Sequence, residues 1–254
     1  MSELNNKTSL ITGGTSGIGK AIAELFAKND SKVIILDIDK NGEKIASSLN
    51  GYFYQADLTK QDQTENIINQ IKNDHEKIDI LINNAGYQTI KKIEDLHNEI
   101  WNSMLQIMLT TPFQLIKSVL PTMKNNKWGR IINISSIHGL VASPFKSAYI
   151  SAKHGLIGLT KTIALETGDY GITSNAICPA YVKTNLTEKQ ITDQAKILNI
   201  KESEFIEKVA LGPAAIKSLI EPDEVANLAL FLASDKASKI TGSSYNIDLG
   251  WTAK

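Results

Sequence analysis

Tyr149 and Lys153 are the two residues whose types and spacing point most directly to chemistry. On a helix, residues four positions apart lie on the same face, so this phenol and this ammonium would share one space. A nearby ammonium favours the phenolate and moves the tyrosine pKa, ordinarily about 10, towards the range of an acid/base catalyst. A lone pair with this spacing is more often a surface tyrosine packed on a lysine stem. The surrounding sequence therefore has to decide between the two interpretations.

The elements that must position this pair alternate between short β-branched runs and amphipathic stretches. We expect strands at 8–12, 32–37, 51–57, 77–83, 129–135, 172–178 and 243–250. We expect helices at 20–28, 41–50, 61–76, 97–124, 147–168, 187–220 and 221–234, with Pro112 bending the fourth helix or opening a second segment. The alternation predicts an α/β fold, a doubly wound parallel sheet with helices on both faces. In such a sheet the ligand lies beyond the carboxyl ends of the strands.

Residues 187–220 would form a helical insertion at that edge, between two late strands. We interpret the insertion as a lid over the substrate, because loops at this edge commonly carry function. The alternative is a helical decoration of the core. No repeat or Pro/Gly-rich linker divides the chain, so we expect one domain over 1–254 that includes this lid.

The bulk composition excludes several classes of function. Lys+Arg and Asp+Glu are both 27, which gives no electrostatic case for nucleic acid or an anionic membrane as a partner. Cys178 is the one cysteine, so no intrachain disulfide can form. No signal peptide or apolar run of the ~18 residues that a membrane span needs is visible. We expect a cytoplasmic protein with no metal site.

Residues 12–19, TGGTSGIG, come directly between a strand and a helix. Glycines there let the backbone approach a phosphate closely, and the helix offers free N–H groups to it. Asp37 ends the second strand, where a carboxylate can accept both hydroxyls of an adenosine ribose and repel a 2′-phosphate. With Gly14 and Thr15 nearby and no cation, we expect NAD and not NADP. The alternative for Asp37 is a helix cap.

Two further strand ends carry polar or small residues. Asp57 and Leu58 follow the third strand, where a carboxylate could meet the adenine amino group. The run 83–86, NNAG, follows the fourth strand and would let the backbone pass close to a ribose. Ordinary turn chemistry is the alternative for both.

The motifs TGGTSGIG, NNAG, the Ser136 of NISS and YxxxK occur here in a fixed order at strand ends. In this combination the chain resembles the short-chain dehydrogenase/reductase family over essentially its whole length. WGRIINISSIHGLV, KSAYISAKHGLIGLTK, NAICPAYV and LGWTAK add a closer likeness to the bacterial D-3-hydroxybutyrate dehydrogenases. The resemblance implies a seven-stranded Rossmann sheet, a homotetramer, and hydride transfer between NAD and a small hydroxy acid or keto acid.

The resemblance also assigns roles to individual residues. It implies Tyr149 as the acid/base, Lys153 as the group that tunes it and anchors the nicotinamide ribose, and Ser136 as the donor to the reacting oxygen. The residues implied to hold the substrate carboxylate are Gln88, His138, Lys146 and Gln190. The residues implied at the cofactor are Gly13, Thr15, Ser16, Gly17, Ile18, Gly19, Asp37, Asp57, Leu58, Asn84, Ala85, Gly86, Tyr149, Lys153, Pro179 and Val182. Solvent exposure is the alternative for Lys146 and Gln190, and a hydrogen-bonded loop histidine for His138.

The chain departs from the family pattern at two places. Met108 stands where the family usually has an asparagine whose backbone carbonyl serves a proton relay. Ala180 and Tyr181 stand where close relatives tend to have Gly and Trp. Two alternatives to the hydroxybutyrate reaction follow: reduction of another carbonyl, such as a 3-oxoacyl thioester or a sugar, or dinucleotide binding without catalysis. We expect Trp251 to pack in a subunit interface.

Overall fold

Seven parallel strands form the sheet of the computed structural model, which describes residues 2–253. The spatial order is β3-β2-β1-β4-β5-β6-β7. The chain crosses from one half of the sheet to the other between β3 and β4, so β1 and β4 lie side by side at the centre. This arrangement confirms the predicted doubly wound α/β fold. The strands are β1 Thr8–Thr12, β2 Lys32–Asp37, β3 Tyr52–Gln55, β4 Ile80–Asn83, β5 Gly129–Ile134, β6 Ile172–Pro179 and β7 Ser244–Ile247.

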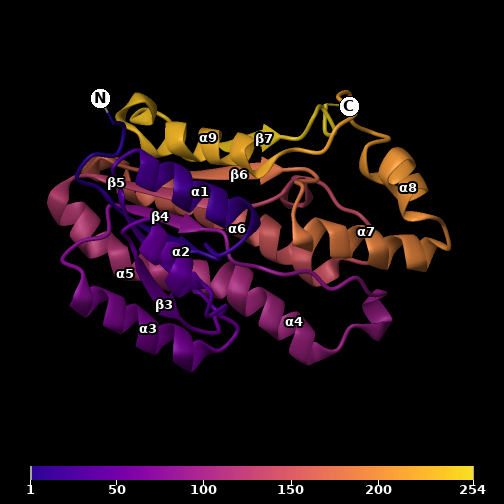
Figure 1. Ribbon diagram of the computed structural model, residues 1–254, viewed down its shortest axis with the longest axis horizontal. Helices are drawn as coiled ribbons and strands as arrows, with labels where there is room; N and C mark the ends of the chain where they lie inside the picture. The colour runs from indigo at the N-terminus through magenta and orange to yellow at the C-terminus, as the bar shows by residue number, and fades with distance from the viewer. Residues whose placement is uncertain (1, 254) are drawn as a thin grey trace.

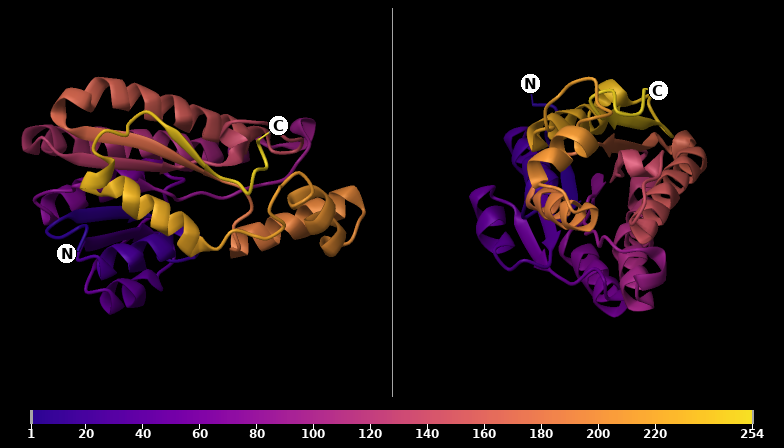
Figure 2. Two further views of the ribbon diagram at one scale, coloured as in Figure 1. Left: turned by 90° about the horizontal axis from the view of Figure 1, so that it is seen from above. Right: turned by 90° about the vertical axis from the view of Figure 1, so that its right-hand side faces the viewer.

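Helices cover both faces of the sheet (Figures 1 and 2). One face packs on α1 Gly17–Lys28, α2 Gly42–Ser48 and α9 Pro222–Ala233. The other face packs on α3 Gln61–Asp74, α5 Thr111–Asn126 and α6 Ser147–Thr167. The central strands carry apolar side chains on both sides because helices cover both faces of the sheet. On β2, Ile35 faces the first helical layer and Ile34 faces the second. Within residues 2–253, no helix has the length and apolar character to cross a membrane.

The predicted long helix at 97–124 is divided in the structure. It consists of α4 Asn98–Leu105, a π-helical segment Gln106–Thr110, and α5. Pro112 occupies the first turn of α5, where its missing N–H removes a donor from the backbone ladder. The π segment carries Met108 and lies at the edge of the sheet where ligands bind. π-helical segments within α-helices are frequent at functional sites.

The predicted helical insertion at 187–220 is only partly helical. It contains α7 Asn185–Leu198, α8 Glu202–Phe205 and a π-helical segment Ile206–Ala210, after which the chain runs irregularly to α9. Helix formation stops there because Gly212 is followed by Pro213, and proline disfavours the helical conformation in the residue before it. Figure 1 shows α7 and α8 beyond the carboxyl ends of the strands, at the edge where a ligand is expected.

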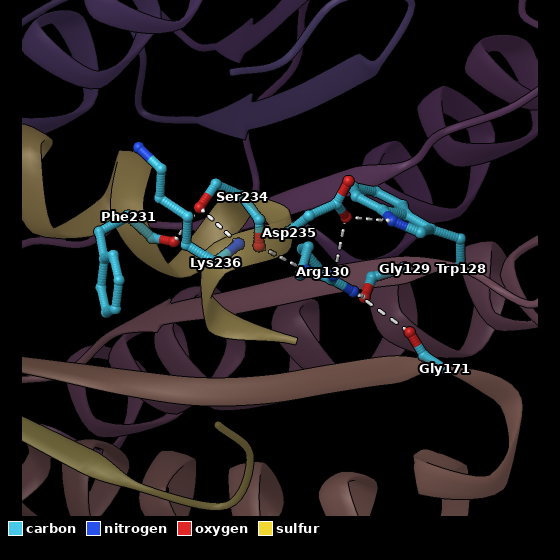
Figure 3. Close-up of polar contacts among 8 residues, drawn as sticks. All are labelled: Trp128, Gly129, Arg130, Gly171, Phe231, Ser234, Asp235 and Lys236. Carbon is cyan, nitrogen blue, oxygen red and sulfur yellow. Dashed lines mark hydrogen bonds and ion pairs between the residues drawn. The ribbon is translucent and has the colours of Figure 1, made fainter. Parts of the chain in front are cut away.

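At the opposite, amino-terminal edge, Arg130 at the start of β5 ties three segments together (Figure 3). Its side chain is 1% exposed and stacks 4.3 Å from the centre of the Trp128 ring. The guanidinium donates to the Gly129 carbonyl, to the Gly171 and Ser234 carbonyls, and to the Asp235 carboxylate. A planar group with several fixed donors suits this set of acceptors. The contact joins β5 to the turns that precede β6 and follow α9.

Candidate active site

The glycine-rich loop between β1 and α1 packs directly on the loop that follows β4. Gly13 has a φ of +67°, and a Cβ there would lie 2.9 Å from the Asn84 amide nitrogen. A Cβ on Gly19 would lie 2.1 Å from the Gly13 carbonyl oxygen. The Thr12 hydroxyl accepts hydrogen bonds from the backbone N–H groups of Asn84 and Ala85, both at 3.0 Å. The two loops therefore form one tight wall, and only glycine fits at its closest points.

A cavity of about 440 Å³ opens beside this wall. The strand-end residues that the sequence assigned to a cofactor meet in it, although they come from four different strands. Those that line it are Gly13, Thr15, Ser16, Ile18, Asp37, Asp57, Leu58, Asn84, Ala85 and Gly86. Gly17 and Gly19 do not line this cavity. Both are needed for close packing around the loop, and a Cβ on Gly17 would lie 2.8 Å from the Thr184 side chain.

Asp37 closes one end of this cavity. Its carboxylate accepts hydrogen bonds from the Thr15 hydroxyl at 2.7 Å and the Thr15 backbone N–H at 3.1 Å. The helix-cap alternative is wrong, because α2 begins after Asn41 and Asp37 makes no contact with its first turn. Asp57 also accepts from Thr59, so the expected turn chemistry and the expected place in the cavity both occur. A cavity lined by a glycine-rich loop at the start of a helix and by a carboxylate at the end of the second strand fits a dinucleotide.

A smaller cavity of about 100 Å³ continues from the first past Asn84 and Gly86. Ser136 reaches it from the end of β5, and Tyr149 and Lys153 reach it from α6. The Ser136 hydroxyl and the Tyr149 phenol are near enough in this cavity for Ser136 to lower the pKa of Tyr149. Pro179 and Val182, at the end of β6, line the same cavity. Tyr149 and Lys153 thus both face the smaller cavity, which lies next to the larger cavity that fits a dinucleotide.

The charge state of the pair differs from the expectation. The Lys153 ammonium donates to the Ile134 carbonyl oxygen at 2.6 Å and lies 5.6 Å from the centre of the Tyr149 ring. Burial raises the pKa of Tyr149, and the nearby Ser136 hydroxyl offsets this only in part. Burial also lowers the pKa of Lys153 to about 8. The side chains of this chain alone therefore favour a neutral phenol, because desolvation of Tyr149 outweighs the effect of Ser136.

Three of the four residues assigned to the substrate carboxylate, Gln88, His138 and Gln190, line the smaller cavity. Lys146 is not among the residues that line the cavity. The alternative prediction for Lys146, solvent exposure, is wrong because the residue is 1% exposed. Neither Lys146 Nζ nor Gln88 Nε2 has a hydrogen-bond partner within residues 2–253. Burial lowers the pKa of Lys146 to about 7 and, together with the Lys146 charge, that of His138 to about 3. A group of unpaired donors without a carboxylate suits an anionic ligand.

Other residues of the smaller cavity were not among the candidates. Thr184, Leu186 and Thr187 line it from the start of α7, and Ser135 and Ile137 from either side of Ser136. The only sequence signal for Ser135 and Ile137 is that they adjoin Ser136. Thr184, Leu186 and Thr187 carry no such signal. Met108 is 1% exposed, lines the cavity, and would contact a Cβ placed on Gly86.

Trp251 packs within its own chain. Its ring lies 6.3 Å from the His138 ring, and its Nε1 atom is buried without a hydrogen-bond partner among the described residues 2–253. The turn that carries it is held by Asp248, which accepts from the backbone N–H groups of Gly250 and Thr252. Trp251 is thus a neighbour of the candidate substrate site in the same chain.

Comparison with known proteins identifies the class. Residues 13–252 match the family described as enoyl-(acyl carrier protein) reductase. Together with the fold and the relatives below, this match shows that the chain belongs to the short-chain dehydrogenase/reductase family, as its motifs predicted. It is an oxidoreductase of that family.

Two relatives and one solved structure are similar to this chain over nearly its whole length. The chain is 45% identical to a D-beta-hydroxybutyrate dehydrogenase of Rhizobium meliloti, over 98% of this chain and 99% of the relative. It is 41% identical to the enzyme of the same name from Cupriavidus necator, over 99% and 100%. A Beutenbergia cavernae structure, assigned as an NAD(P)-dependent gluconate 5-dehydrogenase with NADP bound at low occupancy, superposes with a TM-score of 0.89. Its identity to this chain is 27%, with 99% of both chains covered.

Proposed function

We propose that this chain interconverts D-3-hydroxybutyrate and acetoacetate with NAD as the hydride acceptor. The observation that carries the proposal is the pair of unpaired buried donors, Gln88 and Lys146, at the cavity that Ser136, Tyr149 and Tyr181 line. A short acid with a carboxylate two bonds from its carbinol carbon can place one end on each group. The relatives named for this substrate support the assignment. The cavity of about 100 Å³ favours a short substrate.

In the oxidation, Tyr149 in its phenolate form accepts the proton of the substrate hydroxyl through its phenolic oxygen. Ser136 donates to the same substrate oxygen and orients it. Lys153 lines the same cavity, and its ammonium, 5.6 Å from the centre of the Tyr149 ring, supplies positive charge near the phenol. A bound nicotinamide supplies the site for the hydride, and its positive ring favours the phenolate. In the reverse direction Tyr149 returns the proton to the ketone oxygen.

NAD is proposed over NADP because of Asp37. Its carboxylate faces the larger cavity and keeps acceptor capacity beyond its bonds to Thr15, which suits ribose hydroxyls. A 2′-phosphate at the same place would meet a negative charge. The proposal extends to a single catalytic domain over 1–254, with 187–220 as its lid, that works as a cytoplasmic homotetramer. α7 supports the lid assignment, because Gln190 and Thr187 on it line the smaller cavity.

The test is reduction of NAD and of NADP, followed by absorbance, with a panel of short hydroxy acids. We expect turnover of D-3-hydroxybutyrate with NAD, little with the L enantiomer, and a strong preference for NAD that Asp37→Ala weakens. Turnover only of a 3-hydroxyacyl thioester or a sugar, included in the same panel, would replace the substrate assignment. Cofactor binding without turnover of any substrate would mean a dinucleotide-binding protein without catalysis.

A further inference from the structure

Thr15 lies in the glycine-rich loop, but both of its hydrogen-bond donors are used within the chain. Its hydroxyl donates to Asp37 Oδ2 at 2.7 Å, and its backbone N–H donates to the same oxygen at 3.1 Å. A threonine hydroxyl carries one proton, so the residue has no further donor to offer. Thr15 nevertheless lines the larger cavity, where binding a phosphate would need a free N–H or hydroxyl. The donors of Thr15 therefore act on a cofactor only through Asp37.

The fold brings Thr15 to Asp37 because the glycine-rich loop runs beside the end of β2. The Gly13 N–H donates to the carbonyl of Leu36, the residue before Asp37, at 2.9 Å. The other carboxylate oxygen, Asp37 Oδ1, accepts from the Asp39 backbone N–H at 3.1 Å. Within residues 2–253, the Thr15 hydroxyl is the one side-chain group that donates to Asp37. The Asp37 carboxylate is thus held from two sides, and one of its three bonds depends on a replaceable side chain.

Exclusion of a 2′-phosphate from the larger cavity depends on negative charge. Asp37, Asp39 and Asp57 line this cavity, and no lysine or arginine of residues 2–253 lines it. The Asp39 carboxylate accepts from the Asn41 backbone N–H, and the Asp57 carboxylate accepts from Thr59. Asp37 is partly exposed, so a carboxylate without its bonds could rotate towards solvent and away from a phosphate. The exclusion is effective only if the Asp37 carboxylate stays in place.

We propose that Thr15 is a positioning residue for cofactor discrimination. Its hydroxyl keeps the Asp37 carboxylate facing the larger cavity, where the carboxylate accepts ribose hydroxyls and repels a 2′-phosphate. This inference rests on the preference for NAD in the proposed function. Without the Thr15 hydroxyl, Asp37 keeps its charge but can rotate away when a 2′-phosphate enters. Loss of the hydroxyl therefore weakens the preference for the cofactor without the phosphate, although the carboxylate is still present.

The experiment measures the binding of NADH and of NADPH by their fluorescence, with no substrate present. Thr15→Val keeps the size of the side chain and removes the hydroxyl. We expect it to lower the ratio of NADH affinity to NADPH affinity about tenfold, the effect of losing one hydrogen bond to a charged group. Thr15→Ala, which cannot crowd the loop, should lower the ratio to the same extent. Thr15→Ser retains the hydroxyl and should keep the wild-type ratio.

A double-mutant cycle tests whether Thr15 acts through Asp37. Asp37→Asn should lower the ratio more than Thr15→Val does, and adding Thr15→Val to Asp37→Asn should lower it no further. The matched control is Thr59→Val, because the Thr59 hydroxyl and N–H donate to Asp57 in the same cavity, at 2.6 and 2.9 Å. Asp57 is assigned to the adenine, which NADH and NADPH share. Thr59→Val should therefore change both affinities by the same factor and leave their ratio unchanged.

An unchanged ratio in Thr15→Val and Thr15→Ala would overturn the proposal, and so would a ratio that falls equally in Thr15→Ser. An effect of Thr15→Val that persists in the Asp37→Asn background would overturn it as well, because the hydroxyl would then contact the cofactor directly. If the wild type binds NADH no better than NADPH, the cofactor assignment of the proposed function fails, and this inference fails with it. The wild-type titration therefore separates the two failures.

Discussion

Two buried cations occupy opposite edges of the same sheet, Arg130 at the amino ends of the strands and Lys146 at the carboxyl ends. Both are 1% exposed. The Arg130 guanidinium has four acceptors and an aromatic ring. The Lys146 ammonium has no hydrogen-bond partner among residues 2–253, and it lies 5.7 Å from the centre of the Tyr181 ring. A buried charge that is fully paired holds the fold together. A buried charge that is left unpaired costs stability. This cost is explained if a bound ligand supplies the missing partner.

The most severe effect on stability should come from Arg130→Met. The substitution leaves three backbone carbonyls at the amino-terminal edge without their donor, and we expect unfolding to become easier by about 3–5 kcal/mol. Urea unfolding followed by circular dichroism measures the loss. The kcat/KM per folded molecule should stay unchanged. A stable variant with impaired catalysis would reverse the roles assigned to the two cations.

The matched substitution at the other edge, Lys146→Met, should have the opposite profile. Removing a buried ammonium without partners should leave stability unchanged or raise it by about 1–3 kcal/mol. The KM for D-3-hydroxybutyrate should rise by about 10- to 100-fold, because a charged hydrogen bond to the carboxylate is lost. Steady-state kinetics and urea unfolding are run on the same preparations. A variant that is strongly destabilised and keeps its KM would contradict the comparison.

The pH dependence of KM and of stability tests the role of Lys146 further, because burial lowers the pKa of Lys146 to about 7. Lys146 must be protonated to bind an anion, so the KM of the hydroxy acid should be flat below pH 7 and rise about fivefold between pH 7 and 8. The unfolded chain, with an ordinary lysine pKa of about 10.4, binds more protons from pH 7 to 10. The stability of the wild type relative to Lys146→Met should therefore increase across this window. A difference in stability that does not change with pH would show that Lys146 is fully charged in the folded chain.

The smallest effect is expected at Met108, where the family usually has an asparagine. The side chain fills space against Gly86, and the position still supplies its backbone carbonyl from the π-helical segment. We expect Met108→Asn to leave kcat at the same order of magnitude, while the added buried amide lowers the thermal midpoint. Turnover and thermal unfolding are compared with the wild type. A large gain in kcat would mean that the proton relay is impaired in this chain.

Local pattern was sufficient to predict the layers of the fold, and together with the family resemblance it predicted most of the assigned residues that line the two cavities, although Thr184, Leu186 and Thr187 were missed. The strand at 32–37 was predicted with its bounds unchanged, because a run such as VIIL is apolar on both faces only in a covered parallel sheet. Asp37, Ser136 and Tyr149 reach the cavities because the carboxyl ends of parallel strands meet at one edge.

Other features depend on long-range contacts that no local pattern records. The Lys153 ammonium bonds to the Ile134 carbonyl across 19 residues, and burial, which spacing does not show, raises the pKa of Tyr149. The place of Trp251 against His138 is likewise set by the turn at Asp248.

The central claim is that the Tyr149 hydroxyl moves the substrate proton in a cavity completed by unpaired donors. The direct measurement is NADH formation from D-3-hydroxybutyrate by the wild type and by Tyr149→Phe, with NAD binding measured on both proteins. We predict that kcat falls by about 10²- to 10⁴-fold in the variant while NAD binding is retained. Equal turnover by the two proteins would contradict the account.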